Sequence, residues 1–334
     1  MKSFSVTAYP TAAGLQAIDR KLGAPLAFIP ISKIQSDFIN DFYDAISPHL
    51  DKIPEIDGIA DTGVDSVNIF LEQHHFDIKL DPTQDPLAIS TAAVMDLLES
   101  WYDAGTITLI ERGAPEIYRV YHSVEEHADC PAGPDYSTSQ MVFKRIVRSR
   151  SWQNTFPAVK MPAKAVRVFH NPQHPSPIIQ ILTKTPDKVF ITLAPETHAS
   201  GFDLLRQVAS WQTTAVPVQT EFTDFSFPMV AFDETTALDF LVGLQVTGGD
   251  ATKTTPYKID HALQQTRVRM NELGLRVKSA ASFKMSITGY PPPTMMYCIT
   301  RPFILWIARE SLNWPLFAGY FAPDAWKNPN TLNI

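Results

Sequence analysis

The feature that most restricts the fold of this chain is a two-residue alternation between Leu275 and Thr288. Polar or basic side chains hold most even-numbered positions, and apolar or small side chains hold the odd-numbered ones. This two-residue period is typical of a strand with one buried face. Extended at about 3.3 Å per residue, the segment would reach roughly 46 Å, which is long for any strand. Apolar or small side chains hold the odd-numbered positions: Leu275, Val277, Ser279, Ala281, Phe283, Met285 and Ile287.

The alternation stops at Gly289 and the three prolines at 291–293, which cannot continue inside a sheet because proline lacks a backbone donor. Two interpretations remain open at this point. The segment is either a long edge strand that ends in a proline-rich loop, or an exposed loop that can become a strand.

The remainder of the chain predicts an α+β fold, with helices concentrated in residues 1–138 and strands in residues 139–334. We expect a single domain over residues 1–334, without internal repeats. One expected helix is capped by Ser32 and carries Ile34, Phe38 and Phe42. A second begins at Asp85, is capped by Gly105, and carries Val94, Leu97, Leu98 and Trp101 on one face. Two more are expected over 201–211 and 235–244. Expected strands are 67–71, 141–147, 165–169, 177–183, 189–193, 263–270, 303–308 and 316–321.

Composition excludes several classes of protein. A formal charge of −7 argues against a nucleic-acid partner, whose phosphates require a basic surface. Apolar runs such as 302–308 are far shorter than the roughly 20 residues of a membrane span, so no membrane partner is expected. Cys130 and Cys298 imply no disulfide framework, and the N-terminus makes a poor signal peptide. With no Asn-x-Ser/Thr acceptor in the sequence, these features favour an intracellular, cytoplasmic protein over a secreted one, or else a mature form already cleaved.

Rival functional sites are weak. His122 and His127 lie near Asp129 and Cys130, and these are ligand types for zinc, but a spacing of five does not share one helix face. We therefore expect a solvated polar stretch and no metal. Without a P-loop, Gly-x-Ser-x-Gly or Gly-x-Gly-x-x-Gly motif, we expect neither an enzyme nor a cofactor. The basic cluster at 144–150 is expected to be a solvated strand edge, with a polyanion or acidic partner as the alternative.

Six short motifs in a fixed order resemble the serpins, and together they span almost the whole chain. They are Pro25–Ser32, similar to the strand leading into helix B; Leu97–Ile110, similar to helix F and its exit; Ser149–Phe156, similar to the Trp-containing stretch at the top of the central sheet; Val189–Glu196; Asn271–Gly274, which matches Asn-Glu-x-Gly at the loop hinge; and 301–319, similar to the two C-terminal strands. The resemblance implies a large mixed, mainly antiparallel central sheet with helices and an exposed reactive-centre loop at 274–300.

The resemblance also implies a mechanism without a catalytic residue. In serpins a serine protease attacks the loop and forms an acyl-enzyme, and the cut loop then inserts into the central sheet as a new strand, distorting the protease. Family spacing places the reactive bond at Thr288–Gly289, where threonine would suit an elastase-like pocket. Lys284, Met285 and Tyr290 are alternative specificity residues. The hinge would comprise Glu272, Gly274, Leu275, Val277, Ser279 and Ala281.

The sequence departs from the inhibitory pattern at the hinge. Leu275 stands where inhibitors have Thr or Ser, and Val277 where they have Ala; a packed sheet tolerates added volume poorly. Ile29, Lys144 and Gln264 stand near positions where the family has Ser, Asn and His. These changes leave open a non-inhibitory structural or interaction module, so the expected partner is either a protease or a structural protein.

Overall fold

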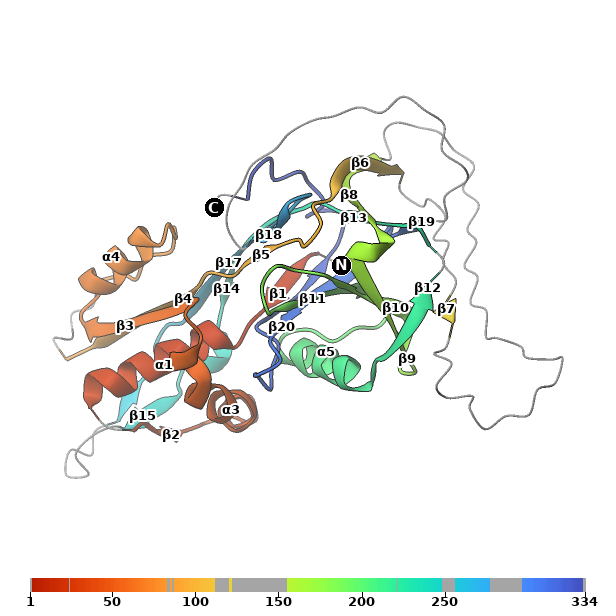
Figure 1. Cartoon of the computed structure of the whole chain (residues 1–334). Helices are drawn as coiled ribbons and strands as arrows, with labels where there is room; N and C mark the ends of the chain where they lie inside the picture. Colours follow the sequence, from red (N-terminus) through yellow and green to blue (C-terminus); the bar gives the residue numbers. More distant parts are fainter. Residues whose placement is uncertain are drawn as a thin grey trace, which may run out of the picture.

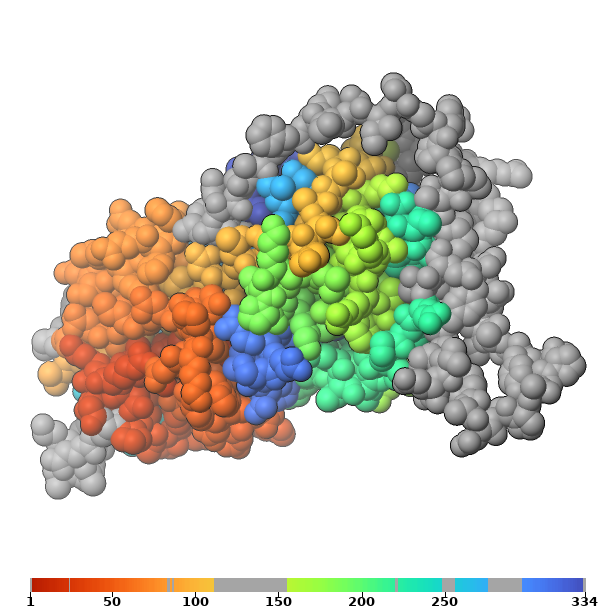
Figure 2. Space-filling model, viewed as in Figure 1, coloured from red at the N-terminus to blue at the C-terminus, as the bar shows by residue number. Residues whose placement is uncertain are grey.

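The computed structural model describes residues 2–23, 25–82, 85, 87–111, 120–121, 155–220, 222–247, 256–276 and 296–332. The fold combines helices with mainly antiparallel sheets, as expected of an α+β protein (Figure 1). The N-terminal residues, coloured red to orange, gather at one end of the molecule, and the green residues, from about 155 to 220, lie toward the other (Figure 2).

The largest sheet of the described residues has eight strands, and its neighbouring strands are antiparallel. Every residue of its β20, Phe-Ile-Leu-Trp-Ile-Ala, is buried, which is typical of a strand covered on both faces. In spatial order the strands are β1 (Phe4–Val6), β21 (Phe317–Phe321), β20 (Phe303–Ala308), β11 (Lys188–Leu193), β10 (His174–Ile181), β9 (Val166–Asn171), β12 (Val216–Thr220) and β7 (Val120–Tyr121).

Helix α5 (Phe202–Thr214) covers one face of this sheet. The ring of Trp211 in this helix stacks on the ring of His174 of β10, with 4.4 Å between the ring centroids. The same ring lies 6.3 Å from the ring of Trp306 of β20, again between centroids. The apolar side of the helix, which includes Leu204 and Val208, is thereby buried in the core.

A second sheet has four strands and contains a parallel pair. Its order is β19 (Met296–Cys298), β13 (Asp224–Pro228), β8 (Thr155–Pro162) and β6 (Thr106–Glu111). β13 is parallel to β19 and antiparallel to β8, so the fold mixes both kinds of pairing.

The central sheet consists of two hydrogen-bonded parts. One part is β14 (Val230–Ala237), β17 (Leu263–Met270), β18 (Gly274–Arg276) and β5 (Leu98–Ser100), and the other is β3 (Ile56–Thr62) and β4 (Ile89–Met95). Two residues, Asp96 and Leu97, separate β4 from β5, so these strands are successive parts of one extended segment. The chain therefore connects the two parts where β4 runs into β5, whereas β4 is not hydrogen-bonded to β17.

Helices lie on both sides of β3 and β4 (Figure 1). α1 (Tyr9–Leu22) is on one side and α4 (Asp65–Gln73) on the other. Gly23 ends α1 at φ +71, a left-handed conformation that glycine adopts without strain. α2 (Lys33–Phe38) continues through a π-helical turn, Ile39–Tyr43, into α3 (Asp44–Ile46) and a 3₁₀ helix, Ser47–Lys52.

A small sheet completes the described fold, with the order β16 (Tyr257–Lys258), β15 (Gln245–Thr247) and β2 (Ala27–Ile29). Short 3₁₀ turns occupy Ala163–Ala165 and Asp239–Leu241. No helix among the described residues is long and apolar enough to cross a membrane.

Several local predictions are confirmed. The Ser32 hydroxyl caps α2 by accepting from the Gln35 amide at 3.4 Å. The strands expected at 165–169, 177–183, 189–193, 263–270, 303–308 and 316–321 all form, as does the helix at 201–211. The strand expected at 141–147 lies outside the described residues.

Three local predictions are wrong. The stretch 67–71 belongs to helix α4, because Val67, Phe70 and Leu71 are buried together at helical spacing. The helix expected to carry Val94 is instead strands β4 and β5, because β-branched residues of β4 pair with β3 along its whole length. The helix expected at 235–244 is the end of β14 followed by a 3₁₀ turn, because its β-branched threonines pair with β17.

Candidate functional site

The first residues of the predicted reactive-centre loop form β18, a strand inside the central sheet. β18 runs antiparallel to both of its neighbours: Leu275 lies opposite Met270 of β17 and opposite Glu99 of β5. The side chain of Leu275 is fully buried. A three-residue strand thus separates β17 from β5 at this end of the sheet.

The turn that leads into β18 is held by the chain beyond β5. The Asn271 side chain accepts the Leu273 amide at 2.9 Å, and the Asn271 amide donates to the Gly274 carbonyl at 3.0 Å. Trp101, which is 1 % exposed, donates its indole Nε1–H to the Asn271 carbonyl at 2.9 Å. The Gly105 amide donates to the Glu272 carbonyl at 2.7 Å. Trp101 and Gly105 therefore hold the turn, and the prediction of a helix that carries Trp101 and is capped by Gly105 is wrong.

Gly274 occupies a position that only glycine fits without displacement. A β-carbon on residue 274 would stand 2.3 Å from the Glu99 carbonyl oxygen. The absence of a side chain therefore permits the close pairing of β18 with β5.

A buried cluster of charged groups lies behind β5. Glu99 accepts a hydrogen bond from the Thr185 hydroxyl, and Asp187, which is 3 % exposed, forms a salt bridge with Arg309 at 2.6 Å. Arg309 also binds Glu55 at 2.9 Å. Burial, together with the neighbouring Asp187 carboxylate, raises the pKa of Glu99 to about 8 although the Thr185 hydrogen bond opposes the shift.

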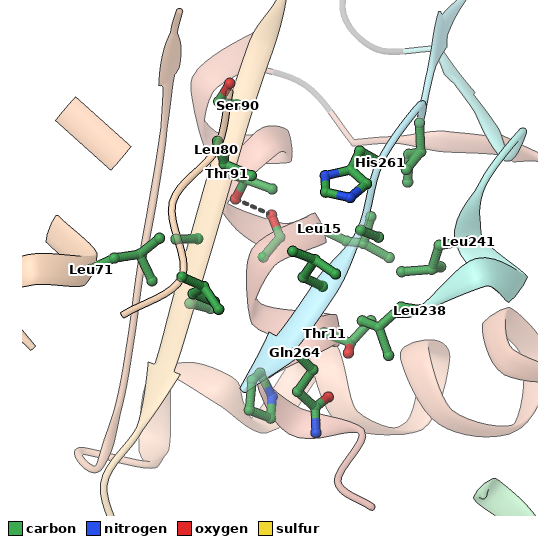
Figure 3. A pocket seen from close by; sticks show the side chains of 18 of the residues that line it. Thr11, Leu15, Leu71, Leu80, Ser90, Thr91, Leu238, Leu241, His261 and Gln264 are labelled. Carbon is green, nitrogen blue, oxygen red and sulfur yellow. Dashed lines mark hydrogen bonds between the residues drawn. The ribbon is translucent and has the colours of Figure 1, made fainter. Parts of the chain in front are cut away.

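Beyond β18 the central sheet is open. A cavity of about 1430 Å³ lies between β4 and β17, and α1 forms its floor; we call it the cleft. Thr11 and Leu15 of α1, Thr91 of β4 and Gln264 of β17 all point toward it (Figure 3). The Thr91 hydroxyl lies 2.9 Å from the Gly14 carbonyl, which ties β4 to the floor (Figure 3).

The width of the cleft follows from the pairing at its upper end. β17 and β5 are each hydrogen-bonded to β18, so they stand two strand spacings apart, which is about 9.5 Å. β4 continues directly from β5 along the other side of the cleft. At the end next to β18, the cleft is therefore one strand wide.

Three of the predicted hinge residues lie where β18 begins: Glu272 is buried in the turn, and Gly274 and Leu275 are in the strand. Val277, Ser279, Ala281, Thr288 and Gly289 lie outside the described residues. So do His122, His127, Asp129 and Cys130 of the rejected metal site, and the basic residues Lys144, Arg145, Arg148 and Arg150.

Three motif assignments are wrong in position. Pro25–Ser32 forms β2, paired with β15, whereas the helix that floors the cleft is α1, which follows β1. Ile29 accordingly does not lie at the centre of the sheet. Leu97–Ile110 is not a helix exit but includes β5 and β6. The described end of the motif Ser149–Phe156 belongs to β8, outside the central sheet. The β-branched residues of 89–94 were the signal that could have placed Trp101 correctly.

Comparison with known proteins agrees with this geometry. No protein-family profile matches the chain, and no curated protein matches its sequence. Among solved structures, mouse protein-Z dependent protease inhibitor matches at 10 % identity, over 96 % of this chain and 90 % of that one, with a TM-score of 0.51. Thyroxine-binding globulin in complex with thyroxine matches at 10 % identity, over 96 % and 92 %, with a TM-score of 0.50.

A third match, Serpin48 of the insect Tenebrio molitor, is 12 % identical over 96 % of this chain and 91 % of that one, with a TM-score of 0.49. Identities this low establish a fold and not an activity. On the first two likenesses, and on its α+β architecture, the chain has the serpin fold.

Proposed function

We propose that the chain inhibits a serine protease by cleavage and insertion of its reactive-centre loop. The observation that carries this proposal is that β18 is already seated at the upper end of a cleft one strand wide. Leu275 also reduces the objection from bulk at its own position, since this large side chain is buried in the sheet without exposure.

Continuing the two observed registers describes the inserted strand. Leu275, Glu99 and Met270 face the interior together, so every second residue of the loop would face α1. If the strand continued in the registers of residues 274–276, Val277 would lie between Val268 and Leu97, Ser279 between Thr266 and Met95, and Ala281 between Gln264 and Ala93. Apolar and small loop residues would thus replace empty space against the floor of the cleft, which favours insertion.

The same registers set how far the inserted strand could extend. On the β4 side, Met285 would reach Ile89, the first residue of β4, so the strand can be extended to about that point. The proposed reactive bond, Thr288–Gly289, lies three residues further along the sequence. The bond would therefore lie just beyond the end of the inserted strand.

The test is to mix the protein with a panel of serine proteases, including elastase-like enzymes with small primary pockets, and to run denaturing gels. We expect a covalent complex with at least one of them. Ala281→Arg, which would place a charge against the floor of the cleft, should be cleaved without forming the complex. Thr288→Arg should move the complex from elastase-like to trypsin-like proteases. The absence of any complex across the panel would count against inhibition.

The alternative function, a non-inhibitory module, is favoured by the size of Val277, which would have to follow Leu275 into the sheet. Thermal unfolding of the loop-cleaved protein distinguishes the inhibitory function from the non-inhibitory one. Cleavage should raise the melting temperature steeply if the loop inserts, and should barely change it in a non-inhibitory module.

A further inference from the structure

The connection from β2 to α2 carries a group of exposed apolar residues. Every residue from Ala27 to Ile31 is apolar, and all of them except Phe28 are exposed. Ile31 is 65 % exposed, and Ile34, in the first turn of α2, is 51 % exposed. Single exposed apolar residues are ordinary on a protein surface, whereas a contiguous group usually marks a contact with another molecule.

Val242 belongs to the same group although it is distant in the sequence. Ile31 packs on the neighbouring Gly243, because a β-carbon on residue 243 would stand 2.6 Å from the Cδ1 atom of Ile31. The Gln35 side chain connects the two segments, since it accepts the Ile31 amide at 2.8 Å and donates to the Val242 carbonyl at 3.2 Å. The four exposed side chains, which we call the apolar patch, are Ile29, Ile31, Ile34 and Val242.

The apolar patch is held in place by groups beneath it. Ser32 caps α2, and the buried Gln35 fixes the turn between β2 and the helix. On the other side, the Gly243 amide donates to the Ile259 carbonyl at 2.8 Å. A surface fixed in this way loses little conformational entropy when it associates, so most of the free energy of burying it is available for binding.

One edge of the apolar patch is charged and lies on β16. Ile29 is opposite Gln245 of β15, and Gln245 is opposite Lys258 of β16. Lys258 therefore points to the same face of the small sheet as Ile29, two strands away. It pairs with Asp260 at 2.8 Å, and both side chains are more than half exposed. This edge thus offers one cation and one anion to a partner.

A second charged edge lies on α2. Lys33 and Asp37, four residues apart on the helix, form an ion pair beside Ile34. Asp239, whose carbonyl accepts the Val242 amide at 3.2 Å, is also exposed. The patch and its edges therefore carry two lysines and three aspartates, which is a small part of the formal charge of −7 of the chain.

This distribution of charge fits a second copy of the chain better than a partner of one charge sign. A two-fold contact brings the same surface to both sides, so it requires a self-complementary surface. With the two-fold axis between the two edges, Lys33 of one copy would meet Asp260 of the other, and Asp37 would meet Lys258. The apolar side chains would then lie at the centre, where the contact excludes water.

The contact would use the face of β2 and not its edge. In the described part of the chain, β2 is the outer strand of the small sheet. Pro25 and Pro30 flank it, and proline has no backbone donor for pairing with a neighbouring strand. The three residues of β2 are also short for edge-to-edge pairing.

We propose that the apolar patch is the contact surface of a two-fold symmetric dimer of this chain. Four apolar side chains between two charged edges make a small interface, so the dimer should form only at high protein concentration. The proposal does not depend on protease inhibition, because no part of the contact requires loop insertion.

The test is sedimentation equilibrium of the full-length protein at increasing concentration, where we expect a monomer–dimer equilibrium. Ile31→Asp places a charge at the centre of the contact and should raise the dimer dissociation constant about tenfold or more. Ile69→Asp is the matched control. Ile69 is 56 % exposed on α4, which lies on the far side of α1 from β2 and β15 (Figure 1), so this variant should change the constant by about twofold or less.

Charge reversal tests whether the partner is a second copy. Lys33→Asp and Asp260→Lys should each weaken the dimer, since each brings two like charges together across the contact. A chain that carries both changes should dimerise more strongly than either single variant, because the reversed residues then meet each other. A partner of different sequence would show no such recovery.

Ile34→Asp repeats the test of the apolar centre if Ile31→Asp folds poorly, and circular dichroism verifies the fold of each variant. A monomer at every concentration would overturn the proposal and leave the apolar patch to a partner of different sequence. The same holds for a dimer that both of these aspartate variants leave unchanged, or for a doubly reversed chain that shows no recovery. None of these outcomes bears on protease inhibition, which the assay for a covalent complex tests separately.

Discussion

Gly274 lies against the carbonyl of Glu99 so closely that a β-carbon at residue 274 would be 2.3 Å from that oxygen. The contact is backbone to backbone, since Gly274 and Ser100 are paired in the ladder between β18 and β5. The obstructing atom cannot rotate away, as the end of a side chain could. The seating of β18 therefore depends on the absence of a side chain at this one position.

Gly274→Ala should expel β18 from the central sheet. Overpacking against a fixed backbone costs about 1–3 kcal/mol, which is comparable to the free energy that the few hydrogen bonds of a three-residue strand contribute to stability. We expect a lower melting temperature and faster amide hydrogen exchange at Leu275. Gly58→Ala in β3 is the control, because a β-carbon there meets nothing nearer than 3.4 Å. Unchanged exchange at Leu275 would contradict the close pairing.

Trp101→Phe should destabilise the turn before β18, because it leaves the buried Asn271 carbonyl without its indole donor. An unsatisfied buried group costs about 1–3 kcal/mol, in addition to the volume lost. Trp306→Phe is the matched comparison: in the described part of the chain, the buried Nε1 of Trp306 has no hydrogen-bond partner. Chemical denaturation should show the larger loss of unfolding free energy for Trp101→Phe, and an equal loss in both variants would refute the argument.

Glu99 should make the protein less stable as the pH rises from neutral to about 8. Burial raises its pKa from 4.5 to about 8, so between those values the folded chain binds the proton that the unfolded chain has released. The stabilisation is complete below pH 4.5 and declines by about 1.4 kcal/mol per pH unit up to pH 8. Glu99→Gln should flatten the unfolding free energy between pH 6.5 and 8, and a persistent slope in that variant would exclude Glu99 as its source.

His174 should have the opposite effect on the acid side. Burial lowers its pKa from 6.5 to about 4, so its neutral form stabilises the folded chain above pH 6.5, and this contribution is lost as the pH falls toward 4. Between pH 4.5 and 6.5 the two slopes should nearly cancel. His174→Gln should remove the rise of stability with pH and leave the decline due to Glu99 exposed over that whole range. The measurement is the midpoint of urea unfolding at successive pH values.

Local pattern was a reliable guide where a strand is mostly apolar and buried or a helix has one buried side. Strands β11 and β20 and helix α5 are of this kind, and their positions follow from sequence. The prediction for the stretch 89–101 was wrong because Val94, Leu97, Leu98 and Trp101 fit a helical spacing. Its true partner, β3, lies more than 25 residues away in the sequence, and local spacing carries no record of that pairing.

The candidate site was predictable only in part. The alternation from Leu275 and the motif Asn271–Gly274 pointed to a segment able to enter a sheet, and β18 shows its first residues there. Glu99, Asp187 and Arg309 could not be inferred, because their cluster brings together residues from three distant parts of the chain. The contacts of residues 74–80 with β17 were equally invisible, since nothing in the sequence of that segment indicates which residues of β17 it contacts.

The three residues of β18 change what kind of event completes the sheet. Starting a new strand in the middle of a sheet requires fixing several backbone angles before the first ladder bonds repay that loss of entropy. In this chain the three residues of β18 are such a nucleus. The proposed insertion would then proceed as elongation of an existing strand, one residue pair after another.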